Sequence, residues 1–232
     1  MGRETTLGGG RRDFGQTSWT MVLLARDRKE LGALIDRYWK PCYFFIRRKG
    51  HEVEDAKDLT QGFFGDLIER DALARVTRTK GKFRTFLLVC LEHFLSNEYD
   101  RRKALKRGGG RKIGSLDFEG AEDLLTRDTD QDPERIFRRQ WAVGLLERAT
   151  TALKEEMGGR FDALKEYITA GQPAGVKELA QKLGLTESNL KVIVHRARKR
   201  YKDLLKLEVA RTVDAKSAID EELGELMAAL SR

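Results

Sequence analysis

The stretch VKELAQKLGLTESNLKVIVHRARKRY, residues Val176–Tyr201, contains two short amphipathic segments separated by Gly184. In both segments the apolar residues recur at three- and four-residue steps, which is the spacing of one helix face. Thr186 can cap the second helix, because its hydroxyl can accept a hydrogen bond from a backbone N–H of the first turn. The buried stripe of that helix would consist of Leu190, Ile193, Val194 and Ala197. A helix, a tight turn and a second helix form the helix-turn-helix unit, and this stretch predicts one.

The second helix, Leu190–Tyr201, would present a basic outward face. Seven Lys or Arg residues and one acid occur between Lys191 and Lys206. Cations on one helix face bind phosphates, and a helix after such a turn can reach base edges in the major groove. The residues on this face or near its edge are Ser188, Lys191, Val192, His195, Arg196 and Lys199. A merely solvated charged face is the alternative, but the preceding helix favours binding to duplex DNA.

The composition of the 232-residue chain fits a helical protein with a polyanionic partner. Forty-five Lys and Arg against 37 Asp and Glu give a net charge of +8. A basic excess favours a nucleic-acid partner, although its distribution along the chain matters more than its sum. The chain has only three prolines, and helix-forming residues dominate it. We therefore predict an all-α fold with two small helical domains of roughly 100 residues each.

Shifts in composition divide the chain into five segments. A glycine run at 108–110 and seven acids between Lys112 and Pro133 separate two helical blocks. This is the composition of a flexible, self-solvating tether. The predicted segments are a disordered leader at 1–17, a helical domain at 18–107, an acidic linker at 108–132, a helix-turn-helix domain at 133–206 and an amphipathic extension at 207–232.

A second basic cluster ends the first block. It continues a helix that begins after Gly81, and its cations are Arg101, Arg102, Lys103, Lys106, Arg107, Arg111 and Lys112. The same helix carries His93, Asn97 and Tyr99. Rings stack on unpaired bases and cations follow the backbone, so this composition favours a melted or single strand. Cations that simply complement the C-terminal end of a helix are the alternative.

Three motifs occur in an order that resembles bacterial sigma factors, and most closely the extracytoplasmic-function group of the sigma-70 family. Glu54–Phe64, EDAKDLTQGFF, is similar to the family's helix for binding the polymerase clamp. Gly81–Leu87, GKFRTFL, with the basic helix after it, is similar to the region that melts the minus-ten element. Val176–Leu205, with HRAR at 195–198, is similar to the reader of the minus-thirty-five element. The ordered set is more specific than any single motif.

The resemblance implies a protein with two promoter contacts and one polymerase contact, which is not an enzyme and uses no cofactor. The residues implied for core polymerase are Asp55, Asp58, Leu59, Gln61 and Phe63. Those implied for the minus-ten strand are Arg84, His93, Asn97, Arg101, Arg102 and Lys103. Those implied for the minus-thirty-five duplex are Ser188, Lys191, Val192, His195, Arg196 and Lys199. Core RNA polymerase and promoter DNA are the implied partners, with an anti-sigma factor or a Ser/Thr kinase as candidate regulators.

The motifs depart from the family pattern at three positions. Many members carry an acid where this chain has Lys57 and another where it has Gly62, and His93 replaces a frequent Asn. Thr60 lies on the clamp-binding helix, and its phosphorylation would add nearly two negative charges to this weakly acidic face. The simpler interpretation, which we favour, is that Thr60 is an ordinary residue of the helix surface.

The C-terminal extension has the pattern of an amphipathic helix. Its apolar stripe consists of Ile219, Leu223, Leu226, Met227 and Leu230. The opposite side carries the acids Asp220, Glu221, Glu222 and Glu225. Such a helix needs a surface that covers its apolar side. The candidates are the protein's own domains, an inhibitor or a second copy of the chain. An acidic helix of this kind can also shield a basic DNA-binding face.

Other classes of protein find little support in the sequence. No stretch reaches the ~18 apolar residues of a membrane helix, and none has the pattern of a secretory signal, so we expect a cytoplasmic protein without a membrane partner. Cys42 and Cys90 are expected as buried free thiols, since a metal site with His51 and His93 lacks the usual ligand spacing. The alternatives to a sigma factor are a stand-alone helix-turn-helix regulator and an RNA-binding or nuclease-type enzyme. No paired carboxylates and no nucleophile–base pair support the enzyme.

Overall fold

The computed structural model describes residues 28–69, 82–104, 116–169, 175–213 and 218–231, and this part of the chain contains helices and no strand, as predicted. Its helices are α2 (Arg28–Arg48), α3 (Val53–Glu69), α4 (Phe83–Ala104), α5 (Ala121–Arg127), α6 (Pro133–Met157), α7 (Arg160–Thr169), α8 (Val176–Lys182), α9 (Glu187–Ala210) and α10 (Ile219–Leu230). The predicted leader at 1–17, the glycine run at 108–110 and the side chains of Arg102 and Lys103 lie outside the described residues.

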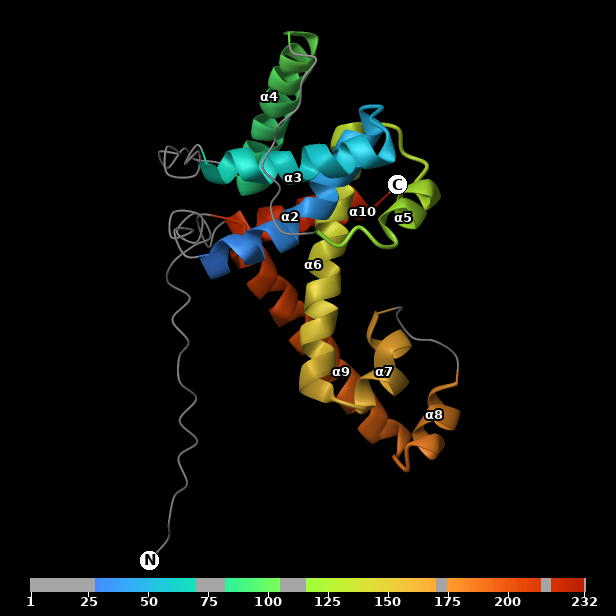
Figure 1. Cartoon of the computed structure of the whole chain (residues 1–232). Helices are drawn as coiled ribbons and strands as arrows, with labels where there is room; N and C mark the ends of the chain where they lie inside the picture. The colour runs from blue at the N-terminus through green and yellow to red at the C-terminus, as the bar shows by residue number, and fades with distance from the viewer. Residues whose placement is uncertain (1–27, 70–81, 105–115, 170–174, 214–217, 232) are drawn as a thin grey trace, which may run out of the picture.

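The larger hydrophobic core is built around α2 (Figure 1). The five successive side chains of Cys42–Ile46 are all fully buried, so α2 is enclosed on every side there. Phe45 of α2 packs edge-on against Phe137 of α6, with ring centroids 6.5 Å apart. Phe63 of α3 packs in the same way against Phe94 of α4, at 5.7 Å. Helix α4 continues beyond this core and projects from the body of the molecule (Figure 1).

A smaller core joins α7, α8 and most of α9 to the second half of α6. Leu153 of α6, Phe161 of α7 and Leu190 of α9 are buried at its centre. This core holds the predicted helix-turn-helix against a long supporting helix.

Helices α6 and α9 each contribute to both cores. The domain boundary predicted at residue 133 therefore does not separate the two cores. The 25 residues of α6 span about 37 Å. Its first half buries Phe137 in the larger core and its second half buries Leu153 in the smaller one. Helix α9 likewise buries Leu190 in the smaller core and Val209 in the larger one. The apolar residues of both helices recur along their whole length, and this is why each helix reaches two cores.

A cluster of ions fixes the end of α9 against α2 and α6. The buried carboxylate of Glu208 accepts hydrogen bonds from Arg37 at 3.0 Å, from Arg148 at 2.9 Å and from Arg211 at 2.5 Å. Burial alone would raise the pKa of Glu208, but these three guanidinium groups lower it below its usual value. Glu208 is therefore charged at neutral pH and ties three segments of the chain together.

The second half of the predicted acidic linker is folded onto α2. Phe118 packs edge-on against Trp39, with ring centroids 5.2 Å apart. Glu122 of α5 accepts two hydrogen bonds of 2.9 Å from the guanidinium of Arg47. The prediction of a flexible tether is therefore wrong for residues 116–132. The acids of this segment suggested a solvated chain, whereas an aromatic ring and an ion pair anchor it.

Candidate nucleic-acid interface

Helix α8, a tight turn and α9 lie where the sequence predicts a helix-turn-helix. Gly184 has a φ of +64°, which is unfavourable for a residue with a side chain. The N–H of Leu185 donates to the carbonyl of Ala180 at 2.8 Å and closes the turn. Thr186 then caps α9, because its hydroxyl accepts a hydrogen bond from the N–H of Asn189 at 3.2 Å. The turn and the cap fix where α9 begins and hence which side chains face outward.

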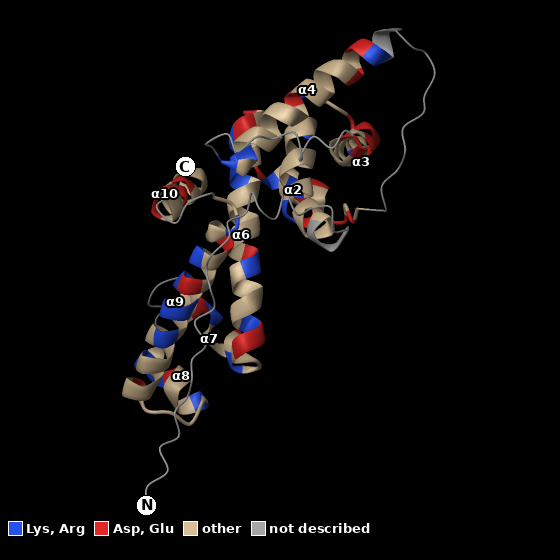
Figure 2. Cartoon of the chain, turned by 90° about the vertical axis from the view of Figure 1, so that its left-hand side faces the viewer, with Lys and Arg blue, Asp and Glu red and all other residues tan. Residues whose placement is uncertain are grey.

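The two faces of α9 differ as the apolar pattern predicts. The inward residues Leu190, Val194 and Ala197 are buried, and Ile193 is half-buried. The residues predicted for the outward face are all exposed: Ser188, Lys191, Val192, His195, Arg196 and Lys199. Within the described part of the chain, none of these six side chains is held in an ion pair. Figure 2 shows Lys and Arg positions spaced along this helix.

Two arginines of α9 stabilise the fold instead of extending the outward face. The Nε of Arg198 donates to the carbonyl of Tyr167 at 2.9 Å, near the end of α7, where carbonyls lack partners within the helix. Arg200 donates to both carboxylate oxygens of Glu156 on α6, at 2.7 and 2.5 Å. The sequence groups both arginines with the DNA-facing cations, because periodicity does not reveal partners on other helices.

The part of α4 that projects from the body (Figures 1 and 2) carries a second set of polar residues, which are exposed. His93, Asn97 and Arg101 recur at four-residue steps, which places them along one side of the helix, and all three are exposed. Tyr99 is 61% exposed, and Arg101 forms an ion pair with Glu98 at 2.8 Å. An exposed ring, an amide and a cation on one projecting helix match what a strand with unpaired bases requires.

Two of the residues predicted to contact polymerase are buried in α3. Leu59 is 4% exposed and Phe63 is 2% exposed, and both belong to the larger core. This part of the prediction is wrong, because the apolar spacing that identifies α3 as a helix also directs these side chains inward. Of the other three residues, Asp58 is exposed, while Asp55 and Gln61 are half-buried.

Both departures from the family pattern on α3 have a local structural counterpart. The Nζ of Lys57 lies 2.7 Å from a carboxylate oxygen of Glu54, so part of the acidic charge is neutralised within the helix. A Cβ atom at Gly62 would lie 3.4 Å from the ring of Phe94 on α4. A Cβ at this distance is in ordinary van der Waals contact, whereas the longer side chain of an acid would press on the α3–α4 contact.

Thr60 does not lie on the surface of α3. Its side chain is fully buried, and its hydroxyl donates to the carbonyl of Ala56 at 2.7 Å. The prediction of a surface residue is wrong, because Thr60 belongs to the buried side of the helix together with its neighbour Leu59. A kinase needs an accessible hydroxyl, so this conformation gives the phosphorylation hypothesis no support.

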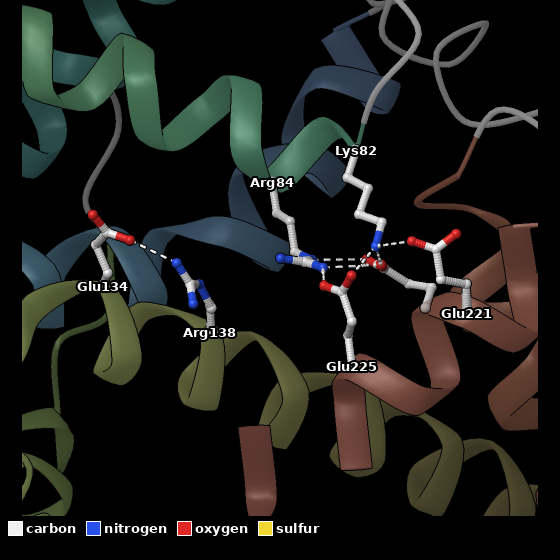
Figure 3. A network of polar contacts seen from close by, with 7 residues as sticks. Lys82, Arg84, Glu134, Arg138, Glu221 and Glu225 are labelled. Carbon is white, nitrogen blue, oxygen red and sulfur yellow. Dashed lines mark hydrogen bonds and ion pairs between the residues drawn. The ribbon is translucent and has the colours of Figure 1, made fainter. Parts of the chain in front are cut away.

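The C-terminal extension covers the start of α4 (Figure 3). The Nε and Nη2 atoms of Arg84 donate to the two carboxylate oxygens of Glu222 at 2.8 and 2.9 Å, and Arg84 also contacts Glu225. The Nζ of Lys82 donates to Glu221 at 2.9 Å and contacts Glu225 as well. Arg84 was predicted to bind the minus-ten strand, but in this conformation it is buried and its hydrogen bonds are made to α10.

The described part of the chain bears on the sequence-based expectations for metal ligands, cysteines and membrane helices. No group of three or more His, Cys, Asp and Glu residues is placed there to hold a metal ion. Cys42 is buried and Cys90 is half-buried, and burial raises the pKa of both thiols, to about 11 for Cys90. No described helix combines the length and the apolar character needed to cross a membrane.

No protein-family model, no curated protein and no solved structure matches this chain significantly. Its function therefore has to be inferred from its own residues. Three features carry that inference: the exposed face of α9, the projecting part of α4 and the helix that covers the start of α4.

Proposed function

We propose that this protein is a sigma factor of the extracytoplasmic-function type, which binds core RNA polymerase in the cytoplasm and directs it to promoters. One observation carries the proposal: two exposed faces of different character occur on one chain. The face of α9 suits duplex DNA, and the projecting part of α4 suits an unpaired strand. A regulator that binds only duplex DNA has no use for the second face. The order of the three sequence motifs supports the same conclusion.

The duplex contact, at the minus-thirty-five element, would be made by the outward face of α9. Lys191 and Lys199 offer cations for backbone phosphates, and Arg196 can donate two parallel hydrogen bonds to a guanine. Val192 is 45% exposed among these charges and offers an apolar surface to a thymine methyl group. This face is already exposed, so it needs no rearrangement before it binds.

The contact with the melted minus-ten strand would be made along α4. Unpaired bases expose rings and hydrogen-bonding edges, which His93 and Asn97 can meet by stacking and hydrogen bonding. Arg101 lies at the distal end of this row and can pair with the strand's backbone. The helix projects from the body, so a strand has room to follow it (Figure 1).

A stand-alone helix-turn-helix regulator is the second candidate, and α3 is the observation that favours it. The apolar residues of its polymerase motif are buried, and Asp55 hydrogen-bonds to His51 at 2.8 Å. Asp58 and half-buried Gln61 are then the principal groups of the motif that remain for a partner. This surface is small and only weakly acidic.

Affinity capture of core bacterial RNA polymerase separates the two candidates. We expect the wild-type chain to capture the enzyme and Asp58→Lys to capture much less, because the exposed acid is reversed in charge. The matched control is Asp162→Lys on α7, which reverses an exposed acid in the smaller core region and should leave capture unchanged. Binding to duplex DNA without any capture of polymerase would instead establish the stand-alone regulator.

A further inference from the structure

The apolar side of α10 is covered by the protein itself. Leu226 is fully buried, and Ile219, Leu223 and Leu230 pack against the larger core. Helix α10 packs mainly against α6 and α9. The sequence leaves open whether the extension packs on its own chain, on an inhibitor or on a second copy, and the structure shows the first arrangement.

The acidic side of α10 meets the two cations at the start of α4. Glu222 is fully buried and the side chain of Arg84 is 6% exposed, so their paired hydrogen bonds lie away from water. The guanidinium carbon of Arg84 also lies 4.6 Å from the ring centroid of Trp141 on α6. Burial alone would lower the pKa of Arg84, but hydrogen bonds and charge from Glu222 raise it, so the guanidinium stays charged. Lys82 lies 3.2 Å from Glu222 and 2.9 Å from Glu221.

The chemistry of this contact is that of a nucleic-acid backbone. A carboxylate and a phosphate both accept two parallel hydrogen bonds from one guanidinium, so they compete for it. If the carboxylate of Glu222 leaves, Arg84 is a buried cation without a partner, and this state is unfavourable in free energy. A phosphate that replaces the carboxylate compensates the charge of Arg84. The outer acid Glu221 is exposed, and Glu225 is half-buried, so the contact is bordered by solvent at one edge.

We propose that α10 is an intramolecular inhibitor of strand binding: its glutamates occupy Lys82 and Arg84, and a single-stranded nucleic acid displaces them. This inference rests on the proposed function, because it concerns the regulation of the strand-binding face of α4. The six outward residues of α9 are exposed while α10 is in place. The chain therefore binds duplex DNA with α10 in place, whereas an unpaired strand that meets the exposed part of α4 reaches Lys82 and Arg84 only after α10 has moved.

The test measures the binding of a fluorescent single-stranded oligonucleotide to the full chain over a range of salt concentrations. The variant Glu222→Gln/Glu225→Gln, the opened variant, keeps the shape of α10 and removes the charges that hold the two cations. We expect this variant to bind the strand roughly tenfold more tightly. We also expect the slope of log affinity against log salt to steepen by about 1.4, because each of two new phosphate contacts adds about 0.7.

The matched control is Glu134→Gln, which removes an exposed ion pair with Arg138 on α6 (Figure 3). It should change neither the affinity nor the slope. Adding Lys82→Ala and Arg84→Ala to the opened variant should abolish its gain, because the cations that α10 releases are then missing. Duplex binding through α9 should be equal in all these proteins.

A second measurement uses the unmodified chain, so that no substitution can disturb the fold. Amide exchange in residues 219–230 should accelerate when the strand binds and stay unchanged when duplex DNA binds. Equal strand affinity and slope in the wild type and the opened variant, with no change in exchange on strand binding, would overturn the inhibitor and leave the sigma-factor proposal intact. Failure of both proteins to bind any strand would overturn both proposals.

Discussion

Two basic regions of this molecule, the outward face of α9 and the start of α4, differ in whether their charges are available. On α9, Lys191 and Arg196 are exposed and have no ion-pair partner within the described residues. At the start of α4, Lys82 and Arg84 are held by the glutamates of α10. The difference is made by a helix distant in the sequence, since Arg84 and Glu222 are 138 positions apart. A basic residue of a nucleic-acid motif is thus available to a ligand only if no other segment of the chain forms an ion pair with it.

The largest effect on stability is expected from breaking the buried ion pair between Arg84 and Glu222. Arg84→Met leaves the carboxylate of Glu222 buried with only Lys82 beside it, so we expect the free energy of unfolding to fall by about 3 kcal/mol. Urea unfolding followed by circular dichroism measures this change. The double variant Arg84→Met/Glu222→Leu removes both charges and should recover most of the loss. Equal losses in the single and the double variant would show that the pair is not a coupled, buried contact.

The second effect sharpens the comparison within α9 itself. Arg196→Ala should weaken duplex binding by about 1–3 kcal/mol, because an exposed DNA contact is lost, while the free energy of unfolding changes by less than about 0.5 kcal/mol. Arg198→Ala should do the reverse: it lowers stability by about 1 kcal/mol, because the hydrogen bond to Tyr167 is lost, and leaves binding nearly unchanged. Anisotropy with a labelled duplex and urea unfolding measure both quantities. A similar loss of binding in both variants would contradict this division of roles.

The third effect disturbs the exposed region without changing its charges. Gly184→Ala places a side chain at a φ of +64°, so we expect it to lower the free energy of unfolding by about 1 kcal/mol. Gly159→Ala is the control, because Gly159 has neither a left-handed φ nor an atom within 4 Å of an added Cβ. Urea unfolding of the two variants gives the comparison. If both lose the same stability, the turn does not need its glycine.

The smallest effect is a pH dependence of the covered region. Burial alone would raise the pKa of Glu225, but the hydrogen bond from Lys82 and the charge of Arg84 lower it below the usual 4.5. Ionised Glu225 therefore contributes stability above about pH 4.5, and the contribution is lost as the pH falls through the lowered value. Urea unfolding between about pH 6 and pH 3 should show a larger loss of stability in the wild type than in Glu225→Gln, which still loses the contribution of Glu208. Parallel curves for the two proteins would mean that the ionisation of Glu225 contributes nothing to stability.

Periodicity in the sequence predicts the helix-turn-helix well, because burial on one helix face is a local pattern. Leu190, Val194 and Ala197 are buried, and the six residues predicted for the outward face are exposed. Gly184 and Thr186 mark the turn and the cap by residue type alone. The amphipathic helix of the extension is predicted for the same reason. Each of these features depends on residues a few positions apart.

The features that the sequence does not predict depend on contacts between distant segments. The motif of α3 suggests a partner for Leu59 and Phe63, yet the same apolar spacing places both side chains in the core. Glu122 belongs to an acidic segment with the composition of a tether, and its role appears only when Arg47 is brought beside it. The sequence predicts that Arg84 contacts DNA, whereas in the structure its guanidinium donates to Glu222 of α10. Charge and spacing identify candidates, and tertiary structure determines which of them are accessible.

Run-off transcription from genomic fragments by core bacterial RNA polymerase, with and without this protein, tests the sigma-factor proposal most directly. We predict new start sites that depend on the protein, that weaken with Arg196→Ala and that strengthen with Glu222→Gln/Glu225→Gln. A sigma factor of known activity, added to the same core enzyme, confirms that the assay works. No new start site with the folded wild-type chain, while its binding to duplex DNA persists, would contradict the proposal.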